Sequence, residues 1–250
     1  MSTDTGGERL DLALVSHGLA GSRSRARQLI EAGDVTVDGV VVTKAAAKVS
    51  SRQVLALADT AHRWASRAAL KLVHALDGFA IDPAEEVCLD IGASTGGFTD
   101  VLLDRGAARV HAVDVGHGQL IARLRDDERV VVYERLNVRD LTPDVIGEPV
   151  GLIVSDVSFI SLQLALPAAL ACACAGAGLV ALVKPQFEVG RARVGRGGIV
   201  RDETARLEAL AEVRNWLEGV AGWPVTGVAD SPIAGTDGNQ EYLISARKPW

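Results

Sequence analysis

The chain has 250 residues, of which 48% are hydrophobic, and its formal net charge at neutral pH is −6. That length accommodates one sizeable α/β core and a small second module. No apolar run is long enough to cross a membrane, and residues 1–8 are polar, without the apolar core of a signal peptide. Cys88, Cys172 and Cys174 have spacings that fit neither a disulfide framework nor a metal site. We therefore expect a cytoplasmic protein with three buried cysteines and no bound metal.

Charge is distributed unevenly along the chain. Residues 1–72 carry ten Lys or Arg against seven Asp or Glu, whereas the remaining residues carry 16 basic against 25 acidic side chains. Attraction to phosphate depends on local clusters of positive charge, because salt screens charges more than about 10 Å apart. The acidic total therefore does not exclude a nucleic-acid partner for the N-terminal part.

The N-terminal part predicts a compact α+β module. Helical spacing of apolar residues indicates helices over 9–17 and 23–31. Alternating valines around Asp38-Gly39 predict a hairpin over 35–42, and a further strand follows at 53–57. The second helix carries three arginines that cannot all face the core, Arg23, Arg25 and Arg27.

From residue 66 onward, helix and strand patterns alternate. Such alternation implies a mostly parallel seven-stranded sheet with helices on both faces, which is a Rossmann-like α/β fold. The strands are predicted at 87–91, 110–113, 130–133, 152–155, 179–183, 225–230 and 242–247. The helices are predicted at 66–76, 97–105, 162–174 and 203–218.

A glycine-rich turn, residues 90–100, joins the first of these strands to the next helix. Glycines let the backbone turn tightly beside a ligand, and open α/β sheets bind ligands beyond the carboxyl ends of their strands. The spacing Gly-x-x-x-Gly differs from that of dinucleotide binders, so we favour S-adenosylmethionine over an ordinary glycine turn. Asp114 is placed for a ribose diol, and Asn137 lies near the adenine edge or is a plain turn residue. The predicted cofactor-binding residues are Asp90, Gly92, Ala93, Ser94, Thr95, Gly96, Gly97, Phe98, Asp114, Asn137 and Asp156.

Four charged residues fall at the ends of predicted elements around the same crevice. Asp156 and Lys184 follow two central strands, Lys71 comes from the helix before the first strand, and Glu241 opens the last strand. Singly, such residues are usually solvated, but together they suit transfer of a methyl group to a hydroxyl. A ribose 2′-hydroxyl is a poor nucleophile and needs a base and an aligning group. We predict that these four residues are catalytic, with Lys184 as the base.

These motifs are similar to those of a known family. Residues 23–39 resemble an S4 RNA-binding domain. Residues 66–72, 92–99, 156–162 and 184–190 match signatures of the hemolysin-A-like (TlyA) ribosomal RNA 2′-O-methyltransferases. The resemblance implies an FtsJ-type methyltransferase domain whose Lys-Asp-Lys-Glu tetrad falls on Lys71, Asp156, Lys184 and Glu241. It also implies S-adenosylmethionine as cofactor and cytidine ribose in ribosomal RNA of the large subunit, or of both subunits, as substrate.

The same resemblance divides the chain into an S4-like domain at 1–58, a linker at 59–65 and the methyltransferase domain at 66–250. The linker sequence His62-Arg63-Trp64-Ala65 departs from the Arg-x-Trp-Val of mycobacterial members, which puts in doubt any coupling of RNA docking to cofactor binding through it. The residues predicted to bind RNA are Arg23, Arg25, Arg27, Arg63 and Arg67.

Two questions stay open at this stage, namely the role of segment 186–200 and the class of protein. The arginines of segment 186–200 either contact RNA phosphates or belong to a surface loop. The protein could be a non-catalytic RNA-binding ribosome assembly factor, a membrane-acting hemolysin or a small-molecule methyltransferase. Intact glycines and four charged side chains favour the RNA methyltransferase. The sequence does not indicate the oligomeric state or the nucleotide that is modified.

Overall fold

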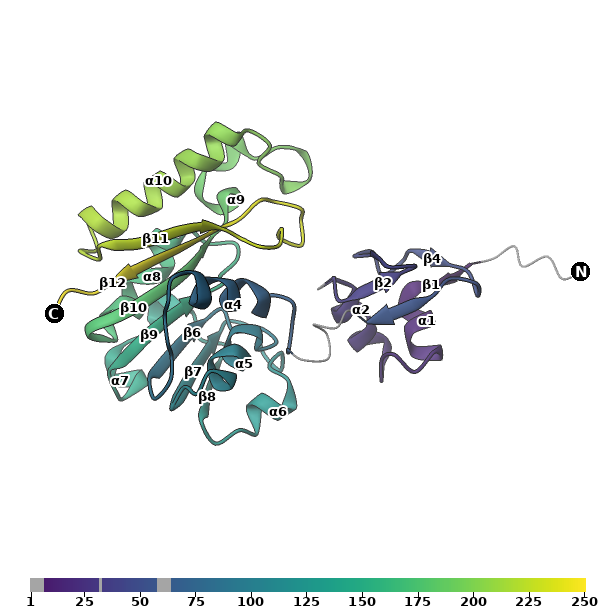
Figure 1. Cartoon of the computed structure of the whole chain (residues 1–250), viewed down its shortest axis with the longest axis horizontal. Helices are drawn as coiled ribbons and strands as arrows, with labels where there is room; N and C mark the ends of the chain where they lie inside the picture. Colours follow the sequence, from purple (N-terminus) through teal and green to yellow (C-terminus); the bar gives the residue numbers. More distant parts are fainter. Residues whose placement is uncertain (1–6, 32, 58–63) are drawn as a thin grey trace, which may run out of the picture. The chain divides into compact units, whose positions relative to one another are not determined.

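The computed structural model describes residues 7–31, 33–57 and 64–250. By its internal contacts the chain forms two compact units, Met1–Ala68 and Ala69–Trp250 (Figure 1). Most of the predicted linker, including Arg63, lies outside the described residues. The bounds of the two predicted domains therefore stay predictions.

The N-terminal unit is a small α+β module. Two helices, α1 and α2, pack together over a core that includes Leu10, Leu14 and Ile30. The three-stranded antiparallel sheet has the order β3-β2-β5, and β1 pairs separately with β4. The elements are β1 (Glu8–Arg9), α1 (Leu10–Ser16), α2 (Arg23–Glu31), β2 (Val35–Val37), β3 (Val40–Val41), β4 (Lys48–Val49) and β5 (Leu55–Leu57).

The predicted hairpin of this unit is confirmed. Asp38 and Gly39, between β2 and β3, have φ angles of 53° and 80°. A two-residue turn with both central residues at positive φ matches the twist of the flanking strands. The pattern missed β1 and β4, since a two-residue strand carries no alternation to detect.

The C-terminal unit is built on a seven-stranded sheet with the order β11-β12-β10-β9-β6-β7-β8. All neighbouring pairs are parallel except those made by β12, which runs antiparallel to both β10 and β11. The predicted fold class is therefore confirmed. The strands are β6 (Val87–Ile91), β7 (Arg109–Asp114), β8 (Val130–Glu134), β9 (Val150–Ser155), β10 (Ala173–Val183), β11 (Val225–Asp230) and β12 (Tyr242–Arg247).

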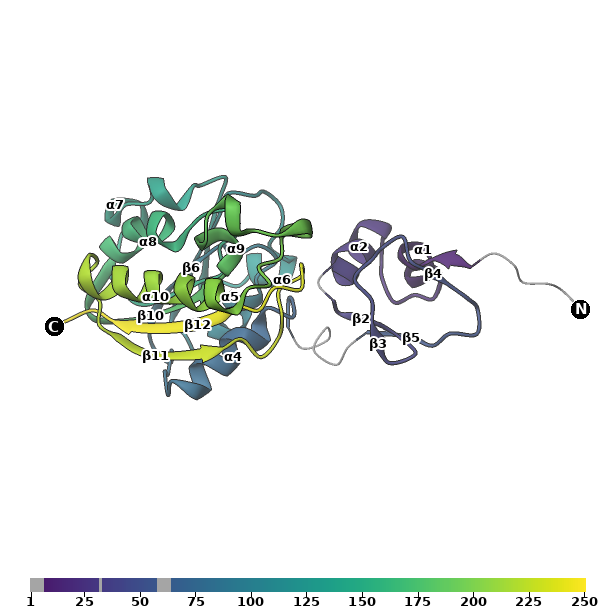
Figure 2. The same ribbon diagram turned by 90° about the horizontal axis from the view of Figure 1, so that it is seen from above.

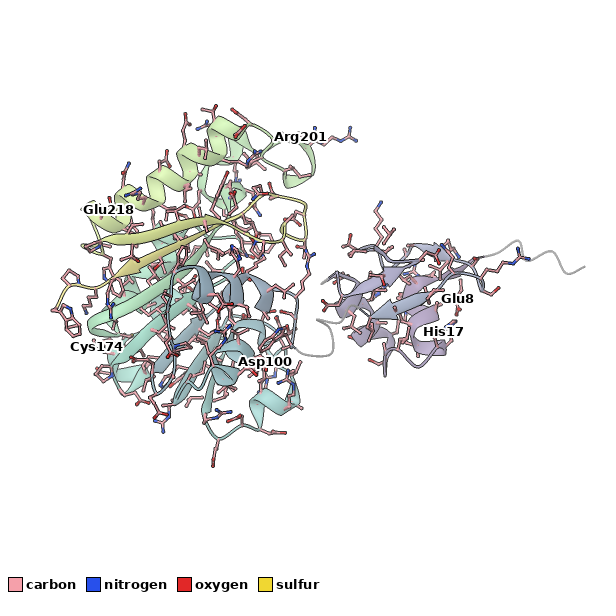
Figure 3. All side chains as sticks on the ribbon, viewed as in Figure 1. Glu8, His17, Asp100, Cys174, Arg201 and Glu218 are labelled. Carbon is pink, nitrogen blue, oxygen red and sulfur yellow. The ribbon has the colours of Figure 1, made fainter. Side chains whose placement is uncertain are left out.

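Helices cover both faces of this sheet (Figure 2). Helices α8 and α10 pack against each other on one face, where Leu89, Ile153 and Leu166 belong to one buried cluster. Helices α4 and α5 pack together on the other face. Arg201, just before α10, and Glu218, near the end of α10, are labelled in Figure 3. The helices are α4 (Ala69–Gly78), α5 (Gly97–Asp104), α6 (Ala122–Arg125), α7 (Pro143–Ile146), α8 (Leu162–Ala171), α9 (Pro185–Glu188) and α10 (Glu203–Gly219), with 3-10 turns η1 (Val138–Asp140), η2 (Arg191–Arg193) and η3 (Arg196–Gly198).

One helix prediction is wrong at its end. The alanine-rich pattern predicted a helix over 162–174, but α8 ends at Ala171 and β10 begins at Ala173. Gly176 has a φ of +74°, which a continuing helix cannot accommodate, and the pairing of β10 with β9 shifts register between Ala173 and Gly178. Cys174 is consequently exposed rather than buried as predicted.

Candidate active site

The site lies where the strand order reverses. From β6 the chain adds β7 and β8 on one side and then β9 and β10 on the other, so the carboxyl ends of β6 and β9 flank a switch point. Gly92, just after β6, has a φ of +85°. A Cβ at this position would lie 2.9 Å from the backbone oxygen of Asp156, just after β9. The turn can pass this close only because glycine is there.

A cavity of about 870 Å³ opens beside this contact. Its wall includes Gly92, Ser94, Asp114, Asn137 and Asp156 from the predicted cofactor residues. Asp114 is held by the turn itself, because it accepts hydrogen bonds from the backbone N–H groups of Ser94 (2.8 Å) and Gly116 (2.6 Å). The structure thus brings five of the predicted residues into one wall around a ligand-sized space.

The other predicted cofactor residues build the turn instead of lining this cavity. Phe98 and Ala93 are buried, and Gly96 is the left-handed residue that starts α5. Thr95 accepts a hydrogen bond from the backbone of Ile121. Gly96 is thus the cap before α5, and Gly97 is the first residue of the helix itself.

Asp90 lies beneath the turn and is fully buried. Its Oδ2 accepts a 2.6 Å hydrogen bond from the Thr99 hydroxyl, while its Oδ1 has no hydrogen-bond partner among the described residues. Burial raises the pKa of Asp90 to about 7, and the nearby charge of Asp156 acts in the same direction. Asp90 lies two residues before Gly92 of the cavity wall, and an unsatisfied buried acceptor suits a cationic or hydrogen-bond-donating group of a ligand.

The four predicted catalytic residues form two ion pairs. Lys71 Nζ lies 2.5 Å from Glu241 Oε2, and both side chains are buried. Lys184 Nζ lies 2.6 Å from Asp156 Oδ1 and donates a 2.8 Å hydrogen bond to the Ser158 hydroxyl.

Strand register explains why these residues meet. Val183 pairs with Tyr242, so the next positions outward, Lys184 and Glu241, face each other across β10 and β12. Asp156 follows Ser155, the last residue of the neighbouring strand β9. Lys71 reaches the same edge from α4 through its contact with Glu241. Strand order and register therefore bring Asp156, Lys184 and Glu241 to one edge of the sheet, where Lys184 pairs with Asp156 and Glu241 pairs with Lys71 from α4.

The predicted RNA-binding arginines belong to the N-terminal unit. Arg23 and Arg27 are on α2, and about half of each side chain is exposed. Arg67 lies against Gly33. The side chain of Arg25 lies outside the described residues, as does Arg63. In segment 186–200, Arg191 lines the cavity, whereas Arg193 is 2.5 Å from Glu208 and so has a partner within the unit.

Sequence reasoning missed one residue that lines the cavity and one that joins two segments of its wall. Phe159 is 92% exposed, has a φ of +65° and lies with its ring centroid 5.2 Å from that of Phe187. A strained, exposed aromatic residue is uncommon away from functional sites. Its signal in the sequence is its place in the family signature at 156–162, three residues after Asp156.

The second missed residue is Glu188, on α9. Its carboxylate accepts hydrogen bonds from the Ser161 hydroxyl (2.7 Å) and the Leu162 backbone N–H (2.9 Å), at the start of α8. Burial raises the pKa of Glu188. Glu188 therefore ties the segment after Lys184 to the segment after Asp156, and both segments line the cavity.

Comparisons with known proteins agree with this geometry. Residues 64–248 match the model of the FtsJ-like methyltransferase family, and residues 8–55 match the S4 domain. A 16S/23S rRNA (cytidine-2′-O)-methyltransferase TlyA of Mycobacterium tuberculosis is 52% identical over 96% of this chain and 89% of its own. Hemolysin A of Brachyspira hyodysenteriae is 42% identical over 94% and 98%. A solved structure, a putative hemolysin from Streptococcus thermophilus, is 40% identical over 98% and 89%, with a TM-score of 0.76.

A switch-point cavity on a seven-stranded sheet, with β12 antiparallel, defines a Rossmann-like methyltransferase. The chain belongs to the FtsJ-like methyltransferase family, in the group of S4-domain proteins that includes the TlyA enzymes.

The raised pKa of Asp90 predicts how stability changes with pH. Folded protein binds this proton up to a pKa of about 7, whereas the unfolded chain releases it near the ordinary aspartate pKa of 3.8. The folded state therefore holds more protons between these values, and its stability falls as pH rises through this window. Asp90→Asn should keep the acceptor for Thr99 and remove this dependence, with a gain on the order of a few kcal/mol at pH 8.

Chemical denaturation of both proteins between pH 4.5 and 8 measures this difference. A parallel fall in the stability of wild type and Asp90→Asn would show that Asp90 does not titrate in this window.

Loss of the two hydrogen bonds that Glu188 accepts should destabilise the segments that line the cavity. Glu188→Ala leaves the Leu162 N–H and the Ser161 hydroxyl without their acceptor, which costs about 1–3 kcal/mol. We expect lower thermal stability and weaker cofactor binding, measured by calorimetry. Glu212→Ala is the matched control, because Glu212 is exposed and its charge raises the pKa of Glu188. Equal losses in the two variants would contradict a role for these hydrogen bonds.

Proposed function

We propose that this protein transfers a methyl group from S-adenosylmethionine to the 2′-hydroxyl of a cytidine in ribosomal RNA. One observation carries the proposal, namely two lysine–carboxylate pairs, one buried and one partly buried, beside a cavity with a glycine cradle. The family match supports methyl transfer, and the printed activity of the mycobacterial relative supports the substrate and the position on the ribose.

The residues around the cavity fit this cofactor. Asp114, fixed by two backbone N–H groups, is placed to accept hydrogen bonds from a ribose diol. Asn137 is the cap of η1, accepting from the backbone of Arg139, and its position on the wall suits the adenine end. Asp156 and the buried acceptor of Asp90 suit the cationic groups at the other end. When bound, S-adenosylmethionine supplies an activated methyl group on sulfur.

The two ion pairs have different tasks in the proposed reaction. Asp156 and the Ser158 hydroxyl, which line the cavity, hold Lys184 Nζ at a fixed point beside it. From there Lys184 aligns the ribose hydroxyl and, in its neutral form, takes its proton as the oxygen–carbon bond forms and the carbon–sulfur bond breaks. Lys71 and Glu241 are buried more deeply than Asp156, and their opposite charges compensate each other beside the Lys184–Asp156 pair. Fixed positions and exclusion of water supply much of the rate in such a transfer.

The RNA must present an accessible ribose to this cavity. The exposed Phe159 offers a ring on which an unstacked base can lie, as single-stranded RNA bases do on aromatic side chains. The arginines of α2 provide phosphate contacts in the N-terminal unit. Because ribosomes are its proposed substrate, we place the enzyme in the cytoplasm.

Two alternatives are less well supported. A non-catalytic assembly factor would not need four charged side chains gathered beside a cofactor cavity, since burying charges is costly. The name of the Brachyspira relative points to hemolysis. Among the helices of the described residues, none has the length and hydropathy that a membrane span requires.

Removal of Lys184 tests the catalytic assignment. Lys184→Ala should lower the rate of methyl transfer to purified ribosomal subunits by roughly a hundredfold or more, because the base and the aligning charge are lost. Cofactor affinity, measured by calorimetry with S-adenosylhomocysteine, should change only a few-fold. Lys248→Ala is the control, because Lys248 Nζ contacts the Ala173 carbonyl on another part of the unit.

Mapping 2′-O-methylation on both subunits identifies the nucleotide. Transfer at the wild-type rate by Lys184→Ala would remove Lys184 from the mechanism. Methylation of a base, or of no RNA at all by the wild-type protein, would overturn the proposed function.

A further inference from the structure

A carboxylate at the centre of an arginine cluster stands out in the N-terminal unit. Asp11, in the first turn of α1, is 0% exposed. Its Oδ1 receives Arg9 Nε at 2.9 Å, and its Oδ2 receives Arg9 Nη2 at 3.0 Å, Arg23 Nε at 2.9 Å and Arg27 Nε at 3.3 Å. Glu8 and His17, labelled in Figure 3, bracket the segment that carries Arg9 and Asp11. One buried acid thus contacts three guanidinium groups.

Three arginine side chains lie close together only because the Asp11 carboxylate offsets their mutual repulsion. Arg23 and Arg27 are four residues apart on α2, so they share one face of the helix, where like charges repel. Arg9 adds a third positive charge from the strand before α1. Asp11 offsets one of the three charges and leaves a cluster with a net charge of about +2.

The contacts leave donors for a further ligand. A guanidinium has five N–H groups, so an arginine that gives its Nε–H to a carboxylate keeps four on its terminal nitrogens. Arg23 and Arg27 both contact Asp11 through Nε, and their side chains are 52% and 51% exposed. Terminal nitrogens held side by side at the surface suit the oxygens of a phosphate backbone.

The charge state of Asp11 is secure. The hydrogen bond from Arg9, reinforced by those from Arg23 and Arg27, holds the pKa of Asp11 well below its usual range despite burial. The carboxylate therefore stays ionised wherever the protein is folded and active.

We propose that Asp11 is a positioning residue for RNA binding, which holds Arg9, Arg23 and Arg27 as one preorganised phosphate-binding cluster. The inference rests on the proposed RNA substrate, and it adds an acidic residue to the residues by which the protein recognises that RNA. It has an unusual consequence, because removing a negative charge should weaken binding to a polyanion. An amide at position 11 would present N–H donors to arginine donors and displace at least one guanidinium group.

A rival role for Asp11 is purely structural, since an acid in the first turn of a helix stabilises it. That role predicts lower stability but no specific loss of RNA affinity in folded protein. The two roles are separated by measuring both quantities on the full-length chain. The matched control is Glu31→Gln, which makes the same change in net charge at an exposed position on α2.

The experiment measures filter binding of purified bacterial 23S ribosomal RNA to wild type, Asp11→Asn and Glu31→Gln, at several KCl concentrations. We expect Glu31→Gln to bind as tightly as wild type or tighter. Asp11→Asn should bind roughly tenfold more weakly at low salt, with a shallower salt dependence from lost phosphate contacts. In an Arg23→Ala/Arg27→Ala background, Asp11→Asn should have little further effect, because it acts through those side chains.

The outcomes separate this inference from the proposed function. Failure of wild type and Glu31→Gln to bind RNA would overturn both. Binding by those two, with Asp11→Asn equal to Glu31→Gln, would overturn only the role of Asp11. If Asp11→Asn shows no cooperative thermal unfolding, Arg27→Lys takes its place, since it keeps the charge and loses the Nε donor. Its control is Arg52→Lys, at an exposed position of the same unit, and equal binding by those two variants would overturn the inference.

Discussion

Two lysine–carboxylate pairs at one edge of a seven-stranded sheet, one buried and one partly buried, are the interactions on which the C-terminal unit depends. Removing a charged group from water costs several kcal/mol unless a partner is held in good geometry. Here backbone pairing fixes the positions, because the register of β10 against β12 places Glu241 opposite Lys184, where Lys71 from α4 reaches it. The strand order then brings Asp156 beside Lys184. A shift of one residue in β12 would leave buried charges without partners.

The cofactor cavity depends on the same edge. The close approach of Gly92 to the Asp156 backbone joins the glycine turn to the segment that holds Lys184 in place. Glu188 joins that segment to α9. The glycine turn, the ion pairs and the segment with the exposed Phe159 are therefore connected through direct contacts. A substitution that breaks one of these contacts is expected to shift the neighbouring residues of the site.

The N-terminal unit shows a related arrangement at the surface. Its helices make a basic face although the whole chain carries a net negative charge. Asp11 lets three arginines stand together that would otherwise repel one another. In both units a carboxylate fixes the position of a positively charged side chain. At the sheet edge the lysines are buried, whereas on α2 the side chains of Arg23 and Arg27 are half exposed.

The sequence by itself determined the elements and the candidate residues. Its periodicities located α2, β6, β11 and β12 at their observed bounds, and its motifs singled out the glycine turn and the four charged residues. Periodicity failed at 172–178, where alanine suits helix and strand alike and a left-handed Gly176 ends the helix. Only the tertiary structure decided that Lys71 pairs with Glu241 and Lys184 with Asp156, and that one oxygen of Asp90 has no hydrogen-bond partner among the described residues. It also decided that Asp11 contacts arginines of α2 and that Glu188 contacts the start of α8. The physical reason is that local pattern specifies each element, whereas contacts between residues up to 170 positions apart depend on the order, direction and register in which the elements pack.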